Sequence, residues 1–346
     1  MGRLKQSKEF LELKEAILKN GKIGIKKVMI SPTDSCNLRC KICWRLDKEK
    51  NPNSWVKQEL NITQIKNILH DCKKLGVKVI DLTGGGEAFC REDIFEIIKI
   101  AKSHGFFVTL TTNGTLLTQE KIQKLIDLQV DDICFSLDSP DQEVNDYIRG
   151  EGVYNKIIDS IKIINKLKFR ENSDKPTLRI ATVLTKKNYK SLDQLIPFCN
   201  DYHIHRINFS VLTEWETNKE FSMKNEKYQE VLNRLRKKLD NNKISHNLNS
   251  IIQYGLFAHE IPRFCFSPWE MVFINSRGDV MACCTLASLY ENVLGNVKKE
   301  SLYDIWFGKN MEDFRTMIKS KVLFEECHWC VPEITERYNK LYAELK

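Results

Sequence analysis

Apolar, β-branched runs alternate with amphipathic helical patterns along the first two thirds of the chain, at intervals of about 25–35 residues. The runs predict strands at Lys27–Ser31, Lys78–Thr83, Phe106–Thr112, Asp132–Leu137, Leu178–Leu184 and His205–Leu212. The patterns between them predict helices at Thr63–Leu75, Asp93–His104, Thr118–Leu128, Tyr154–Leu167 and Ser191–Tyr202. Such β-α units predict an α/β protein with a parallel sheet covered by helices, either open or curled into a barrel.

The pattern is different at the two ends of the chain. Residues 5–20 predict a short amphipathic helix, and Glu226–Leu239 predicts another after the last strand. From Phe264 onward the chain carries five cysteines and three tryptophans without the β-α rhythm. We therefore predict three regions, with boundaries set by the change of composition: an N-terminal helical segment over 1–25, a barrel over 26–250 and a small cysteine-rich domain over 251–346.

Composition narrows the class of protein. The 346 residues are 42% hydrophobic, enough for one large domain and a smaller one, and they include 12 cysteines. The N-terminal residues are charged rather than signal-like, and no run of about 18 apolar residues predicts a membrane span. We expect a cytoplasmic protein whose cysteines serve metal or redox chemistry. The net charge of +8 is spread over mixed-charge helices without a basic–aromatic module, so nucleic acid is not an expected partner.

Three cysteines, Cys36, Cys40 and Cys43, lie within eight residues just after the first predicted strand. Thiolates are the ligands of iron–sulfur clusters, and three of them leave one iron of a four-iron cluster open for a small molecule. A structural zinc site needs four closed ligands, and a disulfide would leave one cysteine over. The loop therefore favours an iron–sulfur cluster over zinc, a disulfide or inert thiols.

Polar side chains gather on one face of three predicted strands, because strand side chains alternate between faces. The sets are Thr109, Thr111 and Asn113; Cys134, Ser136 and Asp138; and Arg206, Asn208 and Ser210. A packing core would need each of these groups hydrogen-bonded, so a ligand site in the barrel interior is the better interpretation. We expect Arg206, Asn208 and Ser210 to contact the substrate.

A glycine run ends in a carboxylate after the second predicted strand, at Gly84-Gly85-Gly86-Glu87. Glycine lets a backbone approach a ligand closely and adopt positive φ. A carboxylate beyond it can accept hydrogen bonds from an ammonium group. A simple turn between strand and helix is the alternative interpretation.

The spacing C-x3-C-x2-C of Cys36, Cys40 and Cys43 resembles the signature of radical S-adenosylmethionine (radical SAM) enzymes. In that family the open iron binds the amino and carboxylate groups of SAM, and an electron from the cluster releases a 5′-deoxyadenosyl radical. The resemblance implies a partial (β/α)6 barrel and a one-electron reductant such as a flavodoxin or ferredoxin. It also implies that the SAM contacts are Gly85, Gly86, Glu87, Asn113, Ser136, Asp138 and Arg149. For Arg149, an exposed loop arginine is the alternative.

A second cysteine set occupies the last third of the chain. Its members are Cys265, Cys283, Cys327 and Cys330, with Gly278 before Cys283. Four thiolates can close a zinc site or a whole cluster. The pattern C-x(9–15)-G-x4-C followed by C-x2-C resembles the SPASM auxiliary domain, in the shortened, twitch-like form because Cys330 is the last cysteine. The resemblance implies one auxiliary [4Fe–4S] cluster with every iron protein-ligated; Cys284 is the alternative to Cys283.

The other cysteines divide by context. Cys72 and Cys199 share helical spacing with leucines and isoleucines, which predicts core packing. Cys90 and Cys134 are expected near the active site at the open end of the barrel, where a thiol could donate a hydrogen atom to a substrate radical. An inert buried thiol is the alternative for both.

The family resemblance, which covers residues from about 25 to 332, implies hydrogen abstraction from a substrate C–H bond. The first 25 residues are too short for a separate peptide-recognition domain. We therefore expect oxidation or epimerisation of a small polar, sugar- or cyclitol-like substrate, helped by the auxiliary cluster. A maturase that modifies, for example cross-links, a ribosomally made peptide or protein is the first alternative. A non-catalytic zinc-binding protein and an RNA-modifying radical SAM enzyme are the others.

Overall fold

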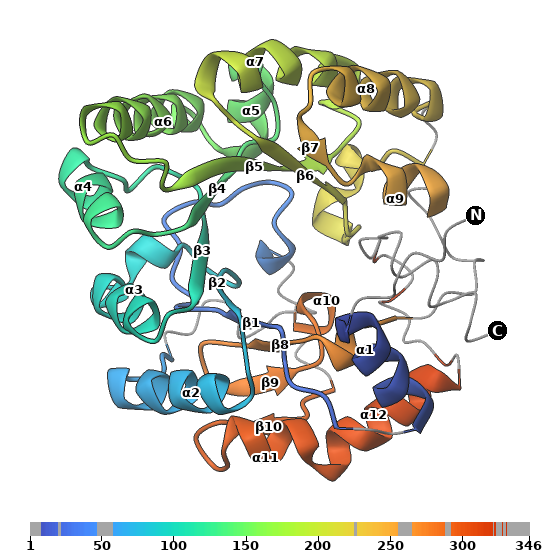
Figure 1. The fold of residues 1–346 in the computed structure, drawn as a ribbon. Helices are drawn as coiled ribbons and strands as arrows, with labels where there is room; N and C mark the ends of the chain where they lie inside the picture. Colours follow the sequence, from blue (N-terminus) through green and yellow to red (C-terminus); the bar gives the residue numbers. More distant parts are fainter. Residues whose placement is uncertain are drawn as a thin grey trace.

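Six parallel strands form the core of the fold and pair in chain order. The computed structural model describes residues 8–19, 22–46, 58–224, 227–254, 265–287 and 292–320, together with Val322, Cys327 and Cys330. The strands are β1 (Lys27–Ile30), β2 (Val79–Leu82), β3 (Phe107–Thr112), β4 (Asp132–Ser136), β5 (Thr177–Leu184) and β6 (Arg206–Val211). They curve into an open barrel with helices outside (Figure 1). The prediction of a partial α/β barrel is confirmed, and every strand ends within one residue of its predicted bounds.

Amphipathic helices cover the outer face of the barrel. They are α2 (Ile62–Lys74), α3 (Ile94–Ser103), α4 (Gln119–Asp127), α5 (Gln142–Arg149), α6 (Val153–Arg170) and α7 (Leu195–Tyr202). Cys72 of α2 and Cys199 of α7 lie in the main hydrophobic core, as predicted. Asn61 begins α2 with a capping box, because its side chain accepts from Gln64 N–H while Gln64 accepts from Asn61 N–H. Helix α5 was not predicted from the sequence.

The C-terminal part of the chain extends the barrel sheet. Strand β8 (Met271–Ile274) pairs in parallel with β1, and β9 (Asp279–Met281) and β10 (Gly295–Asn296) follow antiparallel to it. At the other edge, β7 (Ser245–His246) pairs with β6. This continuity was not predicted, because β8 is only four residues long and lies beyond the alternating strand and helix patterns of the barrel. Residues 255–264, which follow the predicted boundary between residues 250 and 251, lie outside the described residues.

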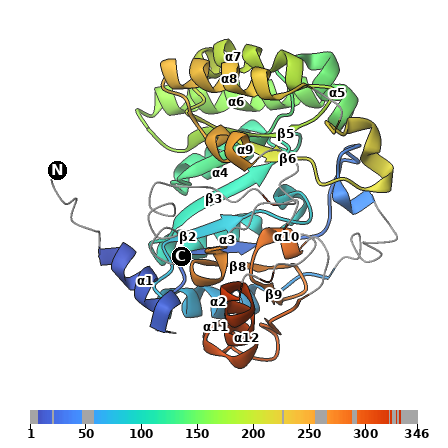
Figure 2. The same cartoon turned by 90° about the vertical axis from the view of Figure 1, so that its right-hand side faces the viewer.

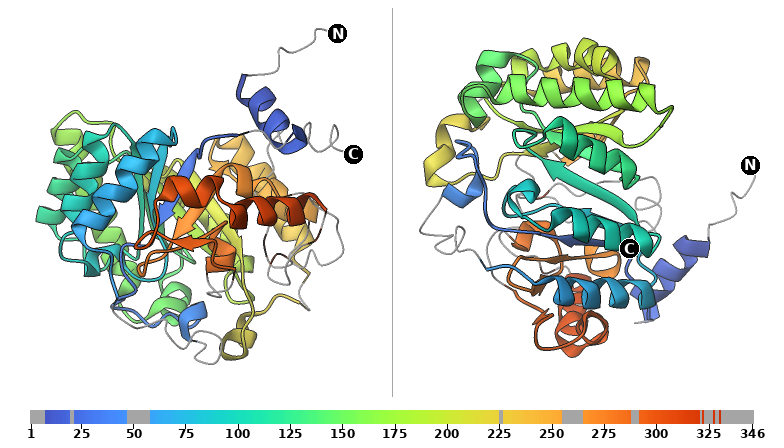
Figure 3. Two further views of the ribbon diagram at one scale, coloured as in Figure 1. Left: turned by 90° about the horizontal axis from the view of Figure 1, so that it is seen from below. Right: turned by 90° about the vertical axis from the view of Figure 1, so that its left-hand side faces the viewer.

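Further helices pack near the two edges of the sheet. They are α1 (Lys8–Lys19), α8 (Gln229–Asn241), α9 (Leu248–Tyr254), α10 (Cys284–Ala287), α11 (Leu302–Phe307) and α12 (Lys309–Lys319). Helices α11 and α12 lie below the sheet in Figure 2, and α11 packs against α2, whose blue ribbon lies just above the orange helices in the right-hand view of Figure 3. Nowhere in the described ranges is a helix long and apolar enough to cross a membrane.

Specific polar contacts join the C-terminal helices to the rest of the fold. The buried Trp306 donates from Nε1 to the Ile23 carbonyl at 2.6 Å, and the Arg315 guanidinium lies 4.2 Å from the centre of the Trp306 ring. The buried carboxylate of Asp71, on α2, accepts the Leu302 N–H at 3.0 Å. Leu302 is the first residue of α11. The barrel helix α2 therefore supplies a hydrogen-bond acceptor for a backbone N–H at the start of a helix of the C-terminal domain.

Replacing Asp71 with alanine should lower the free energy of unfolding by about 1–2 kcal/mol, because the Leu302 N–H would lose its acceptor in a buried position. The midpoint of urea unfolding, followed by circular dichroism, measures the loss. Asp159→Ala on the exposed face of α6 is the matched control and should have little effect. Equal midpoints for the two variants would contradict this role of Asp71.

Candidate functional site

The three N-terminal cysteines lie on one loop, which leaves the carboxyl end of β1. Within the described residues, no three metal-ligating side chains are grouped so as to hold a metal ion. All three cysteines are half-buried, and the Cys43 N–H donates to the Cys40 carbonyl at 2.9 Å. Burial raises the pKa of the Cys40 thiol to about 11; the Arg149 guanidinium opposes this rise, and the neighbouring Cys43 and Cys36 add to it. Three soft sulfur donors beside a cation fit an anionic iron–sulfur cluster.

The glycine run after β2 packs directly against this loop. A Cβ on Gly85 would lie 2.2 Å from Asp34 Oδ1, and one on Gly86 would lie 2.1 Å from the Ser35 carbonyl oxygen. The Glu87 N–H also donates to the Ser35 carbonyl, at 2.8 Å. These glycines therefore allow a close approach of chain to chain, whereas the sequence suggested an approach of chain to ligand.

Glu87 joins the glycine run to the end of β3. Its buried carboxylate accepts hydrogen bonds from Thr112 Oγ1 at 2.7 Å, from the Asn113 N–H at 2.7 Å and from the Phe89 N–H at 3.3 Å. Burial raises the pKa of Glu87, and these three bonds oppose the rise. Asn113 in turn donates from Nδ2 to Asn37 Oδ1 at 2.9 Å, in the cysteine loop. Asn113, and through it the Glu87 network, is thus hydrogen-bonded to the cysteine loop.

A buried ion pair lies on the opposite side of the cysteine loop. Arg149 Nε is 2.8 Å from Asp138 Oδ2, and Asp138 Oδ1 accepts the Val183 N–H at 2.9 Å. Arg149 is the last residue of α5, and its carbonyl accepts from Cys40 Sγ at 3.7 Å. Arg149 is therefore a largely buried helix residue rather than an exposed loop residue. Ser136, at the end of β4, is half-buried on the face that Asp138 continues.

The two thiols considered as hydrogen donors lie in different surroundings. Cys90 is half-buried, and burial together with the nearby Glu87 and Cys36 raises its pKa. Cys134 is 2% exposed in the middle of β4, and burial raises its pKa to about 11. Cys90 therefore lies next to the cysteine loop, and Cys134 lies deeper in the barrel.

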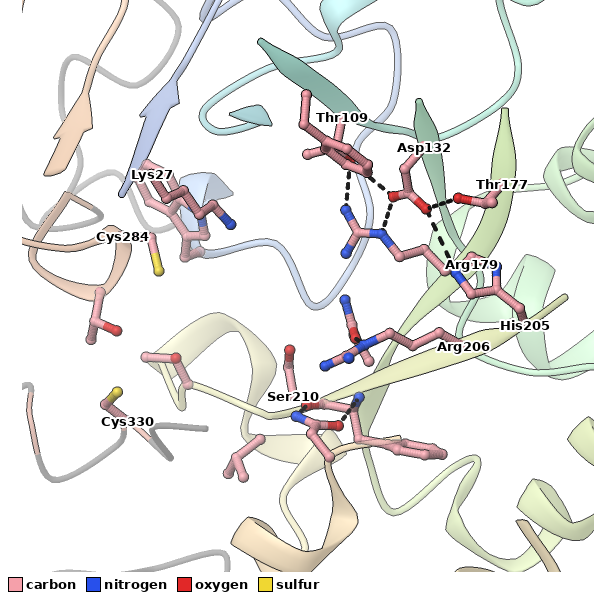
Figure 4. Close-up of a pocket in the computed structure, with 18 residues that line it drawn as sticks. Lys27, Thr109, Asp132, Thr177, Arg179, His205, Arg206, Ser210, Cys284 and Cys330 are labelled. Atoms are coloured by element: carbon pink, nitrogen blue, oxygen red, sulfur yellow. Dashed lines mark hydrogen bonds and ion pairs between the residues drawn. The ribbon is translucent and has the colours of Figure 1, made fainter. Parts of the chain in front are cut away.

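The C-terminal cysteines lie at the β8–β9 side of the barrel. Cys265 and Cys283 are half-buried against the main core, and the Cys330 N–H donates to the Cys327 carbonyl at 3.2 Å. Cys284, the first residue of α10, and Cys330 line one cavity (Figure 4). The C-terminal cysteines offer only thiol ligands, which are the ligands of iron–sulfur clusters. Residues 323–326, 328 and 329 lie outside the described residues.

This cavity, of about 870 Å³, occupies the barrel interior. Its volume falls within the range of small-molecule sites. Trp44, which follows Cys43, and Cys330 both line it, so it reaches from the first cysteine loop to the C-terminal cysteines. Four of the predicted interior positions, Thr109, Arg206, Asn208 and Ser210, line it as well, together with Phe209 and Val211 of β6. The other predicted interior positions, Thr111, Asn113, Cys134, Ser136 and Asp138, are not among its lining residues.

Sequence reasoning missed a polar network on the same wall. Arg179 bonds through Nε to Asp132 and donates from a terminal nitrogen to Thr109 Oγ1 at 2.7 Å; Asp132 also accepts from Thr177 Oγ1 at 2.9 Å. The signal was present in the sequence. Thr177 and Arg179 alternate with the buried Leu178 and Ile180, by the same rule that was applied to the other strands.

Two family models match the chain. The model described as "Radical SAM superfamily" matches residues 30–199, and the SPASM model, described as "Iron-sulfur cluster-binding domain", matches residues 265–331.

Several curated proteins are similar in sequence. The tungsten-containing aldehyde ferredoxin oxidoreductase cofactor-modifying protein of Pyrococcus furiosus is 26% identical over 88% of this chain and 87% of that protein. The AdoMet-dependent heme synthase of Methanosarcina barkeri is 23% identical over 86% of each chain. The mycofactocin maturase MftC of Mycolicibacterium smegmatis is 29% identical over 49% of this chain and 40% of that protein.

Solved structures share the fold. SuiB of Streptococcus suis, bound to the precursor peptide SuiA, gives a TM-score of 0.68 at 20% identity, over 88% of this chain and 70% of that one. The structure of native anSMEcpe with bound AdoMet gives a TM-score of 0.64 at 18% identity, over 92% of this chain and 95% of that one.

The two matched domains account for the predicted cofactors, which are SAM, a SAM-binding [4Fe–4S] cluster and an auxiliary [4Fe–4S] cluster. They follow one another in the order that the two cysteine sets predict, on a barrel of the expected architecture. The chain is therefore a radical SAM enzyme with a C-terminal SPASM domain.

Proposed function

We propose that Cys36, Cys40 and Cys43 hold the SAM-cleaving cluster at the carboxyl end of the barrel. The observation that carries this proposal is the position of three half-buried thiols on one loop, between the Glu87 network and the Arg149–Asp138 ion pair. The cluster and SAM supply, when bound, a 5′-deoxyadenosyl radical that removes a hydrogen atom from a substrate C–H bond. A one-electron carrier such as a flavodoxin or ferredoxin would reduce the cluster.

The residues around the loop have donor and acceptor capacity for SAM. The two oxygens of Glu87 accept three hydrogen bonds, and a carboxylate offers about four lone-pair sites, so one site is available for an ammonium group. Arg149 contacts Asp138 through Nε, and a guanidinium suits a carboxylate. Gly85, Gly86, Asn113, Ser136 and Asp138 complete the proposed SAM surroundings.

The second cluster would be held by Cys265, Cys283, Cys327 and Cys330. The SPASM match over residues 265–331 supports this set. Cys283 is half-buried against the core like Cys265, and it follows Gly278 at the spacing of the SPASM pattern. Both features support Cys283 rather than Cys284 as the ligand. Because Cys330 lines the same cavity as Trp44, the auxiliary cluster would be close enough to position the substrate or accept its electron.

A peptide or protein substrate has better support than the sugar- or cyclitol-like substrate expected from the sequence. MftC is a maturase by name, and SuiB is solved with a precursor peptide. A cofactor-type substrate is a second candidate, because two relatives that align over most of this chain are a cofactor-modifying protein and a heme synthase. Oxidation, epimerisation and cross-linking all begin with the same hydrogen abstraction.

Cys90 and Cys134 are the proposed sources of a hydrogen atom if the product is an epimer. Their thiols are protonated near neutral pH, since burial raises the pKa of both. An epimer formed in deuterium oxide should then carry one deuterium, and alanine at the donating cysteine should abolish its incorporation, as mass spectrometry would show. Full incorporation in both single variants would exclude both thiols.

The Cys36/Cys40/Cys43→Ala triple variant should lose the formation of 5′-deoxyadenosine, because no ligands would remain for the SAM-cleaving cluster. The assay combines anaerobic, reconstituted protein with SAM and dithionite, and chromatography measures the product. Cys199→Ala, at a buried packing position in α7, is the control and should retain the reaction. Product formation by the triple variant at the wild-type rate would refute the cluster assignment.

Gly86→Ala should displace the cysteine loop, because the new Cβ would lie 2.1 Å from the Ser35 carbonyl oxygen. We expect 5′-deoxyadenosine formation to fall about tenfold or more. Gly105→Ala is the matched control: its φ is positive, at +79°, but nothing lies within 4 Å of the added Cβ. It should cost some stability and leave SAM cleavage unchanged. Wild-type cleavage by Gly86→Ala would show that the loop does not depend on this contact.

A further inference from the structure

A basic surface adjoins the first cysteine loop. Lys41, which lies between Cys40 and Cys43, is exposed, and its Nζ is 3.4 Å from the centre of the Tyr147 ring. Lys187 is exposed as well, and its Nζ is 4.9 Å from the centre of the same ring. Both ammonium groups are within the range in which the face of an aromatic ring attracts a cation. We call Lys41, Tyr147 and Lys187 the basic patch.

The basic patch lies at the carboxyl end of the barrel. Its three residues follow strands β1, β4 and β5 in the chain. Because β1 and β5 are not neighbours in the sheet, the cysteine loop spans this end of the barrel to reach the other two residues. Its Ile42 packs there against the apolar cluster of Ile148, Leu212 and Phe221. Phe221 ends the 3-10 helix η4 (Glu216–Phe221), the yellow segment beside the blue cysteine loop at the right of Figure 2.

Hydrogen bonds hold the patch against the proposed cluster ligands. The Lys41 N–H donates to the Ile148 carbonyl at 2.9 Å, and Cys40 Sγ is 3.7 Å from the Arg149 carbonyl oxygen. Tyr147 is therefore one residue away from a direct backbone bond to the cysteine loop. A protein that binds the exposed side of the patch would lie next to the first cluster.

The two ammonium groups have no carboxylate partner within the part of the chain that the structure describes. Glu220 is near, but it accepts the Tyr147 hydroxyl, at 3.0 Å, and contacts neither lysine. By contrast, the exposed Lys124 of α4 pairs with Glu120 at 2.8 Å, one helical turn earlier. The positive charges of Lys41 and Lys187 are thus available to a partner with an acidic surface.

We propose that the basic patch docks an acidic one-electron carrier protein, which reduces the first cluster. This inference rests on the proposed function, because it names the surface through which that cluster receives its electron. The reduced cofactor of the carrier loses one electron and the cluster gains it, and no bond forms or breaks in this step. Complementary charges orient such a carrier and speed its association. Electron-transfer complexes have small interfaces, so a patch of three side chains beside the cluster suits them.

Binding of two carriers, flavodoxin and ferredoxin, to the anaerobically reconstituted enzyme tests the docking surface. Calorimetry measures the dissociation constant of each carrier. For the carrier that binds, we expect Lys187→Gln to raise the dissociation constant about threefold and Lys41→Gln/Lys187→Gln about tenfold, as the loss of one or two exposed ion pairs implies. Raising the salt from about 50 to about 500 mM should weaken the wild-type complex more than that of the double variant.

Lys99→Gln is the matched control, because Lys99 is an exposed lysine of α3, far from the patch, and it should bind the carrier as the wild type does. If the double variant does not match the wild type in circular dichroism and iron content, Lys187→Glu replaces it. Lys187 lies in an exposed turn, and reversing its charge should weaken binding more than Lys187→Gln does.

A second readout compares two reductants in the formation of 5′-deoxyadenosine. Dithionite is a small molecule that needs no docking surface. The rate with the reduced carrier, divided by the rate with dithionite, should fall in the patch variants by about the factor by which their binding weakens. The ratio cancels any effect of a substitution on the SAM site itself.

No binding of either carrier by the wild type would overturn the inference. Patch variants that bind the carrier with wild-type affinity would also overturn it, and the patch would then serve another partner, such as an acidic segment of the substrate. Absence of 5′-deoxyadenosine from the wild type with dithionite would count against the proposed function. Cleavage of SAM with dithionite, together with unchanged carrier binding by the patch variants, would count against this inference alone.

Discussion

The close contact between the glycine run and the cysteine loop is the constraint on which the site depends. Only a residue without a Cβ fits at Gly85 and Gly86, where the added atom would meet Asp34 and Ser35. The buried Glu87 carboxylate then bonds the end of β3 to the same region. These contacts fix a polar loop at the carboxyl end of a parallel barrel, which is the end where such barrels carry their active sites.

The same region connects the two halves of the chain. Ser276, in the turn between β8 and β9, donates to the buried Asp34 carboxylate at 2.6 Å. Asp34 precedes Cys36 by two residues, and Ser276 precedes Cys283 by seven. Because β8 also pairs with β1, the C-terminal domain and the first cysteine loop belong to one continuous sheet. This continuity explains how Trp44, next to the first cysteine set, and Cys330, of the second, come to border one cavity.

The sequence predicted the elements whose signal is local. Strands such as Val79–Leu82 are short apolar runs next to turns, and the Cys36–Cys43 spacing identified the loop without any tertiary information. Helix α5 was not predicted, because its eight residues include few apolar ones. Strand β8 was not predicted either, because its partner β1 lies more than 240 residues earlier in the chain. Arg179 was missed because its importance depends on its register with Asp132 and Arg206. The substrate class depends on such contacts, and the sugar-like expectation had no residue to support it.

The most direct test of the whole account is the iron and sulfide content of the wild-type protein after anaerobic reconstitution, with Mössbauer spectroscopy to identify the clusters. We predict about eight irons and eight sulfides per chain, all in [4Fe–4S] clusters, because the two cysteine sets supply the ligands of two clusters. About four irons would mean that one cysteine set holds no cluster. Zinc in place of iron and sulfide would contradict the assignment of both cysteine sets to iron–sulfur clusters.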